Sequence, residues 1–155
     1  MVLNPFYVNI IIDSCAFDPK YQPESICAEG IFKLYEQEEI NLIVAHSTMK
    51  EIEHPNTPTK VKAAAPGMVY TLKTNLTAGE ILIKKTILDL LTGNGNPKKM
   101  EQDANHIFEA HKYGGYFVTT DERIISKRNG LKDICNAQIV KPCELVAIIK
   151  EYENC

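Results

Sequence analysis

The sequence lacks long apolar runs and a basic leader. Its apolar stretches, such as Val8–Ile12 with an asparagine inside it, are far shorter than the ~20 residues that a membrane-spanning helix needs. The first residues contain neither the positive region nor the small-residue cleavage site of a secretory signal peptide. These absences predict a soluble protein without membrane association, and the cytoplasm is its expected location.

Paired cysteine and histidine motifs are also missing. The five cysteines form no C-x-x-C pair, and an odd number without such a pair is typical of neither a disulfide framework nor a zinc knuckle. The pattern predicts reduced thiols, most of them in the core. The four histidines lack zinc spacing as well, although His54 follows Glu51 by three residues and could line a site there.

The chain has no excess of positive charge. Its net charge is −3, and it contains two arginines. That balance by itself argues against binding to a phosphate backbone. If four carboxylates were engaged with a metal, the remaining charge would be −3 + 4 = +1, and a bound cation reverses the local field. The overall charge therefore excludes neither a protein that binds nucleic acid nor one that does not.

What is present is an alternation of helical and strand patterns. The chain has 155 residues, 45% of them hydrophobic, which predicts one globular domain over residues 1–155. Short apolar runs rich in β-branched and aromatic residues predict strands buried on both faces of a parallel sheet. The expected strands are Phe6–Ile12, Asn41–Ala45, Tyr116–Thr119 and Ala137–Val140, and Met68–Leu72 is ambiguous but could form a further short one.

Helical spacing, caps and breakers predict the segments between these strands. Thr77–Glu80 has the pattern of a capping box, and Gly114–Gly115 closes the helix before the third strand. Strand and helix alternate along the chain, which predicts a three-layer α/β/α fold with a mainly parallel central sheet. The expected helices are Glu24–Glu38, a short one from Ser47, Thr59–Ala65, Ala78–Leu91, Glu101–Tyr113, Glu122–Lys127 and Glu144–Tyr152.

Four acidic residues occupy places that would converge in such a fold. Asp13 and Asp121 follow predicted strands, whose carboxyl ends meet at one edge of a parallel sheet. Glu51 lies in the short helix after the second strand, and Asp103 lies near the start of the helix before the third. Clustered carboxylates repel one another and are the ligands that Mg²⁺ and Mn²⁺ prefer. The sequence therefore predicts one metal site, with Glu53 as the alternative to Glu51.

Basic residues follow the last of these acids. Arg123 and Lys127 would share one face of the predicted short helix, and Arg128 comes next. They could bind phosphates beside a reaction centre, or they could form an ordinary solvated helix face.

The order of these motifs resembles that of PIN-domain ribonucleases, the family that includes VapC-type toxins and RNA-processing nucleases. The matching pieces are I-I-I-D-S at Ile10–Ser14, H-S-T-M-K-E at His46–Glu51, D-A-N-H-I-F-E-A at Asp103–Ala110 and F-V-T-T-D at Phe117–Asp121.

The resemblance implies a Rossmann-like PIN fold and a divalent-metal endoribonuclease whose product carries a 5′-phosphate. It implies that Asp13, Glu51, Asp103 and Asp121 are the catalytic residues and bind Mg²⁺ or Mn²⁺. It also implies that Ser14 and Thr119 orient the carboxylates. A homodimer is common in the family, and a toxin would have an antitoxin partner. The sequence leaves RNA and DNA open as substrates.

Two other functions match parts of the same pattern. A non-catalytic PIN-like module would bind nucleic acid or protein, but this chain retains all four acids. A phosphoacceptor receiver domain would need an acidic pair after its first strand, and here Asp13 stands alone before Ser14.

Overall fold

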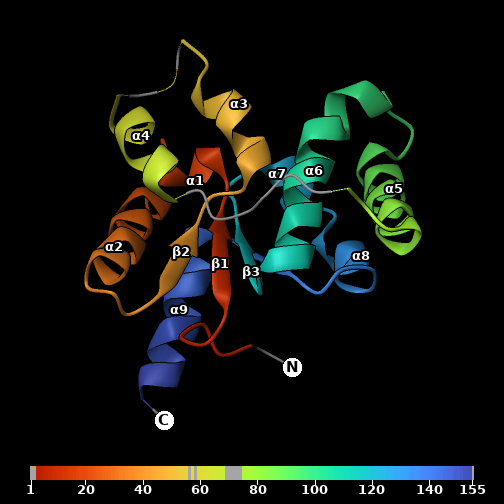
Figure 1. Cartoon of the computed structure of the whole chain (residues 1–155). Helices are drawn as coiled ribbons and strands as arrows, with labels where there is room; N and C mark the ends of the chain where they lie inside the picture. The colour runs from red at the N-terminus through yellow and green to blue at the C-terminus, as the bar shows by residue number, and fades with distance from the viewer. Residues whose placement is uncertain (1–2, 56, 58, 69–74, 155) are drawn as a thin grey trace.

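The centre of the molecule is a sheet of four parallel strands. The computed structural model describes residues 3–55, 57, 59–68 and 75–154. Strands β1 (Asn9–Ile12), β2 (Asn41–Ile43), β3 (Tyr116–Val118) and β4 (Gln138–Val140) lie in the order β2-β1-β3-β4. All three neighbouring pairs are parallel, as Figure 1 shows for the central strands.

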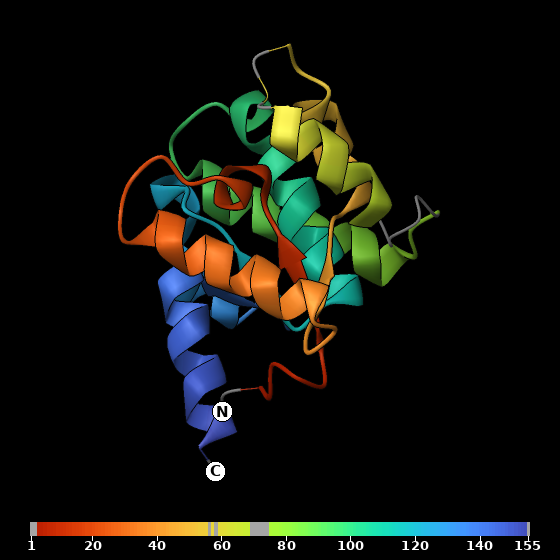
Figure 2. The ribbon, with the colours of Figure 1, turned by 90° about the vertical axis from the view of Figure 1, so that its left-hand side faces the viewer.

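Helices cover both faces of this sheet (Figures 1 and 2). The α-helices are α1 (Ser14–Phe17), α2 (Glu24–Glu36), α3 (Met49–Ile52), α4 (Thr59–Ala64), α5 (Ala78–Thr92), α6 (Pro97–Tyr113), α7 (Glu122–Ile125), α8 (Arg128–Lys132) and α9 (Pro142–Glu153). The 3₁₀ helices within the described ranges are η1 (His46–Thr48) and η2 (Ala65–Met68).

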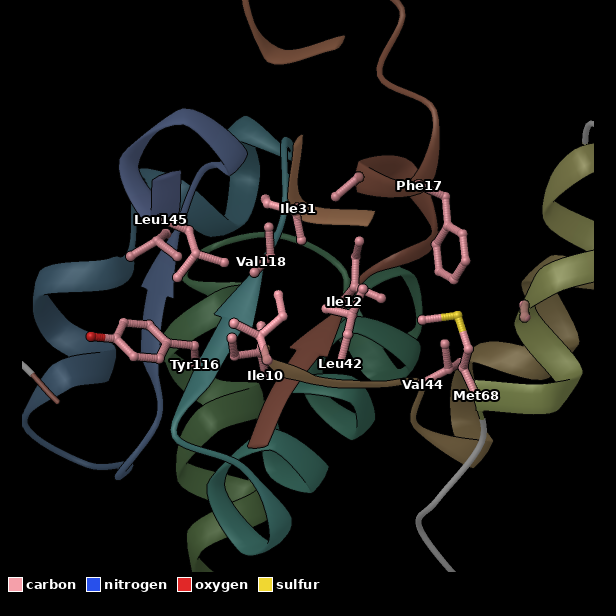
Figure 3. Packing of buried hydrophobic residues seen from close by; sticks show 14 of the residues in the cluster. Ile10, Ile12, Phe17, Ile31, Leu42, Val44, Met68, Tyr116, Val118 and Leu145 are labelled. Atoms are coloured by element: carbon pink, nitrogen blue, oxygen red, sulfur yellow. The ribbon is translucent and has the colours of Figure 1, made fainter. Parts of the chain in front are cut away.

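The alternation of side chains along β1 divides the core into two layers. Ile10 and Ile12 are fully buried on one face, in a cluster with Ile31 of α2 and Leu145 of α9 (Figure 3). Ile11 points to the other face, into a cluster with residues of α5, α6 and α8. The predicted three-layer α/β/α fold is therefore confirmed, and its sheet is parallel throughout.

Several predicted boundaries need correction. Helices α1 and α8 were missed, because a helix of one turn is too short to show a hydrophobic period. Helix α6 begins one turn earlier than expected, since Asn96 caps it with a hydrogen bond from the Lys98 amide. Within the segment Met68–Leu72, Met68 ends η2, and the other residues lie outside the described part of the chain.

The prediction that Arg123 and Lys127 share a helix face was wrong. Helix α7 ends at Ile125, and Lys127 is the residue that precedes α8. The two side chains therefore do not stand one turn apart on a single helix.

The prediction that the cysteines are reduced was wrong for one pair. Cys27 of α2 and Cys143 of α9 form a disulfide that closes a loop of 116 residues, with 5.1 Å between their Cα atoms. Cys15 and Cys135 are free thiols. The pair forms because α2 and α9 pack together on one face of the sheet, which the linear sequence does not show.

Within the described residues, no helix combines the length and the apolar character needed to cross a membrane.

The candidate site lies at the edge of the sheet where the strands end. Figure 1 shows α1, α3, α7 and the first half of α6 together at the upper end of β1 and β3. Each of the predicted acidic residues belongs to one of these elements or to the turn before it.

Candidate metal centre

Asp13 is held at the end of β1 by hydrogen bonds from two sides. Its Oδ1 accepts from the Ser14 amide at 2.9 Å, as the N-cap of α1. Its Oδ2 accepts from the Thr119 hydroxyl at 2.8 Å and from the Cys15 thiol at 3.3 Å. The side chain is almost fully buried, and this burial raises the pKa of Asp13. A buried carboxylate at the end of a strand is costly when it carries its charge alone.

Glu51, rather than Glu53, reaches this place from α3. Oε2 of Glu51 accepts a hydrogen bond of 2.6 Å from the Ser14 hydroxyl, whereas Glu53 is exposed. Oε1 of Glu51 lies 3.2 Å from Nε2 of His106. Burial would raise the pKa of Glu51, but the contacts with His106 and Ser14 lower it overall. Glu51 therefore carries its negative charge beside Asp13.

Asp103 and Asp121 form the other half of the site, and Arg123 joins them. The Arg123 guanidinium donates to both carboxylate oxygens of Asp121, at 3.1 and 2.7 Å, and lies 3.5 Å from Oδ2 of Asp103. Asp121 also caps α7, and its own amide donates to the Thr119 hydroxyl. Thr119 thus connects the two halves, because it contacts both Asp13 and Asp121.

The four acids share one electrostatic environment. Burial, followed by the charges of Asp121 and Asp13, raises the pKa of Asp103 to about 6. Glu51 acts on Asp13 in the same direction. Burial also acts to raise the pKa of Asp121, but its bonds with Arg123 lower it. When all four carboxylates are ionised they repel one another, and a divalent cation would relieve that repulsion.

Sequence reasoning missed His106, which belongs to a compact group of possible ligands. One ligand atom each from Asp13, Glu51 and His106 lie within 4.8 Å of one another. His106 is completely buried, three residues after Asp103 on the same side of α6. Burial would lower its pKa, but Glu51 and Asp13 raise it. The signal in the sequence was this spacing from Asp103, which a search for paired histidines does not detect.

The basic candidates have different surroundings. Of the three, Arg123 contacts the acids, although its side chain is 63% exposed. Arg128 pairs with Glu144 of α9 at 2.7 Å, and Lys127 is exposed. Arg123 is thus the residue that could contact both the acids and an anionic ligand.

A pocket of about 350 Å³ opens next to Glu51. His54 and Asp18 lie on its wall, and Val61 gives it an apolar side. It is lined by Ser14, Cys15, Asp18, Glu51, His54, Thr57 and Val61. The site therefore has adjoining space for part of a ligand larger than an ion.

Comparison with known proteins provides no family. No family model matches the sequence, and no curated protein matches it either. The function must be inferred from the chemistry of this cluster.

The raised pKa of Asp103 leads to a testable effect of pH on stability. With the pKa raised from 3.8 to about 6, folding disfavours the charged form. The resulting stability is complete below about pH 4 and is lost as the pH rises through 6. In the metal-free protein, Asp103→Asn is expected to raise the free energy of unfolding at pH 7.5 by on the order of 2 kcal/mol, and to change it little at pH 4.

Urea unfolding at both pH values, with a chelator present, measures this difference. Added Mn²⁺ should reverse the order at pH 7.5, because the ion needs the charge that the variant lacks. A wild-type protein that is the more stable one at pH 7.5 without metal would contradict the interpretation.

Proposed function

We propose that this protein is a divalent-metal-dependent endoribonuclease of the PIN type. The observation that carries the proposal is that Asp13, Glu51, Asp103 and Asp121 all lie at the carboxyl edge of a parallel sheet, with ligand atoms of Asp13 and Glu51 within 4.8 Å of each other. Each comes from a different element. Thr119 and Arg123 link Asp13, Asp121 and Asp103, and Ser14 and His106 contact Glu51. Four buried or half-buried acids without a cation are unfavourable, so their placement supports a site built for one or more metal ions.

The donor set fits Mg²⁺ or Mn²⁺, since carboxylate oxygens predominate. A bound divalent ion would supply the acidity that makes water a nucleophile at neutral pH, and would neutralise charge on the scissile phosphate. The chain's own residues do the positioning. Thr119 fixes the Oδ2 oxygen of Asp13, and Ser14 fixes the Oε2 oxygen of Glu51. By this proposal the bond between phosphorus and the 3′ oxygen breaks, and the 5′-phosphate stays on the downstream fragment.

Arg123 would contact the substrate backbone. Its exposed guanidinium neutralises Asp121 in the structure, and a phosphate could take over part of that pairing once a cation neutralises the aspartate. Lys127 and Arg128 would bind flanking phosphates less directly, since Arg128 is already paired with Glu144. An anionic strand is then accommodated despite the net charge of −3.

The test is cleavage of a labelled single-stranded RNA with Mn²⁺, with Mg²⁺ and with a chelator. Wild type should cleave with the metals only. Asp121→Asn is expected to slow cleavage at least about tenfold, because Asp121 would hold the cation and orient Arg123. Asp89→Asn, on the exposed side of α5, is the matched control and should keep full activity.

The outcomes separate the candidate functions. Equal activity of wild type and Asp121→Asn, or no activity of either with Mn²⁺, would favour a non-catalytic binding module. Cleavage of a DNA strand of the same sequence would widen the substrate class. Toxicity on expression, relieved by a co-expressed partner, would support the toxin role.

We propose a cytoplasmic location for this activity. The Cys27–Cys143 disulfide argues against that location, because thiols in the cytoplasm are usually kept reduced.

A further inference from the structure

We propose that Nε2 of His106 binds the same metal ion as Asp13 and Glu51. A nitrogen donor would then make the centre prefer Mn²⁺, Co²⁺ or Zn²⁺ to Mg²⁺. This inference rests on the metal site of the proposed function and extends it to a ligand and a class of metal.

The first observation is an unsatisfied nitrogen. His106 has no exposed surface, and its Nε2 has no hydrogen-bond partner among the described residues. That atom lies 3.2 Å from Oε1 of Glu51, near enough for attraction but without the alignment of a hydrogen bond. Leaving a buried polar atom unpaired costs on the order of 1–3 kcal/mol. A cation shared with Asp13 and Glu51 would give this nitrogen a partner.

The second observation is the hydrogen-bond chain on the other side of the ring. Nδ1 of His106 lies 2.8 Å from the hydroxyl oxygen of Ser47. That hydroxyl donates its hydrogen to Oε2 of Glu109, which the Ser47 amide also contacts at 3.3 Å. Because the hydroxyl hydrogen goes to Glu109, the Ser47 oxygen must accept from Nδ1. Nδ1 therefore carries a proton, so in the neutral imidazole the lone pair is on Nε2.

This arrangement is the one that metal-binding histidines use. Such rings usually donate their second nitrogen to a carboxylate or another acceptor, which fixes the tautomer and the orientation. Here Ser47 passes that role to Glu109, which is itself buried and in contact with Nδ1 of His46. Ser47 and Glu109 are thus positioning residues, and they hold Nε2 toward Asp13 and Glu51.

The nitrogen donor decides the class of metal. Mg²⁺ takes oxygen ligands almost exclusively, whereas imidazole suits transition ions. Two carboxylates and one imidazole form a mixed set with open positions for water and phosphate oxygens. Asp103 and Asp121 remain on the other side of Thr119, where they could complete the shell or hold a second ion.

The experiment measures Mn²⁺ binding directly, without RNA. Metal-free wild-type protein is titrated with Mn²⁺ and with Mg²⁺ by calorimetry, and pulsed electron paramagnetic resonance records coupling of bound Mn²⁺ to ¹⁴N. We expect ¹⁴N coupling in wild type and at least about tenfold tighter binding of Mn²⁺ than of Mg²⁺. His106→Gln should lose the coupling and bind Mn²⁺ at least about tenfold more weakly, with a smaller change for Mg²⁺.

Two further variants complete the experiment, one as a control and one as a test of the positioning role of Ser47. His111→Gln changes a histidine near the end of α6 that accepts from the Asn136 amide, so it should keep both the coupling and the affinity. Ser47→Ala should weaken Mn²⁺ binding about tenfold, because the ring loses its fixed orientation.

Bound Mn²⁺ without ¹⁴N coupling in wild type would overturn the inference, and this spectrum needs no variant to fold. RNA cleavage in that same sample would leave the proposed function standing. Coupling to ¹⁴N without RNA cleavage would support His106 as a metal ligand and would contradict the proposed function. No binding of Mn²⁺ at all would overturn both.

Discussion

Asp13→Asn is expected to reduce metal-dependent RNA cleavage by at least about 10³-fold, the largest catalytic loss in the site. Asp13 is the most deeply buried of the four acids and lies in the compact group of possible ligands. An amide of the same shape removes the negative charge and turns an NH₂ group toward the cation or toward the Thr119 hydroxyl. Single-turnover cleavage at saturating Mn²⁺ measures the effect on chemistry separately from weaker binding of the metal.

The matched control is Asp133→Asn, which changes an exposed acid at the end of α8. It should cleave at the wild-type rate. Thermal melting of both variants shows whether they fold. Since Asp13 is buried with a raised pKa, its neutral replacement should fold at least as well without metal. Cleavage by Asp13→Asn within tenfold of wild type would remove Asp13 from the catalytic group.

The acids at strand ends were predictable because local patterns determine where they point. An apolar run that stops at Asp13, and another that stops before Asp121, place both carboxylates at the carboxyl edge of any parallel sheet. Asp103 follows from the register of α6. The choice between Glu51 and Glu53 needed the structure, because the entry into α3 passes through the 3₁₀ turn η1. A change of helix type rotates every later side chain.

His106 was not predictable in the same way. Its neighbours in sequence make it look like one more residue on the buried side of an amphipathic helix. What sets it apart is contact with Ser47 and Glu51, which precede it by 59 and 55 residues in different elements. The spacing Asp–x–x–His indicates that the side chains of Asp103 and His106 point to the same side of α6. It does not indicate which residues of other elements they contact.

The disulfide between Cys27 and Cys143 was not predictable for the same reason, since it depends on contacts between residues that are distant in sequence. An odd number of cysteines without C-x-x-C suggested thiols, because that rule considers spacing along the chain. The pair depends on α2 and α9 covering the same face of the sheet, with the Glu24 carboxylate accepting from the Cys143 amide beside it. Contacts between helices that lie at opposite ends of a chain are outside the reach of local patterns.

Removal of this disulfide is expected to lower the free energy of unfolding by about 2–5 kcal/mol. A crosslink that closes a loop of 116 residues restricts the unfolded chain strongly, and long loops gain the most in the chain-entropy account. The double variant Cys27→Ser/Cys143→Ser and the wild type with a reductant should therefore show similar, lowered stability in urea. The reductant should not affect the double variant, which is the control for its other actions.

RNA cleavage by the double variant Cys27→Ser/Cys143→Ser provides a second measurement. Asp13 and Glu51 accept hydrogen bonds from Thr119 and Ser14, and His106 donates one to Ser47. None of these three partners belongs to α2 or α9. Loss of the crosslink should consequently lower stability while leaving the cleavage rate and Mn²⁺ affinity of the folded protein within about twofold of wild type. Unchanged stability in reductant would contradict a stabilising disulfide. Lost activity in a still-folded variant would show that the helix layer formed by α2 and α9 helps to hold the metal site in place.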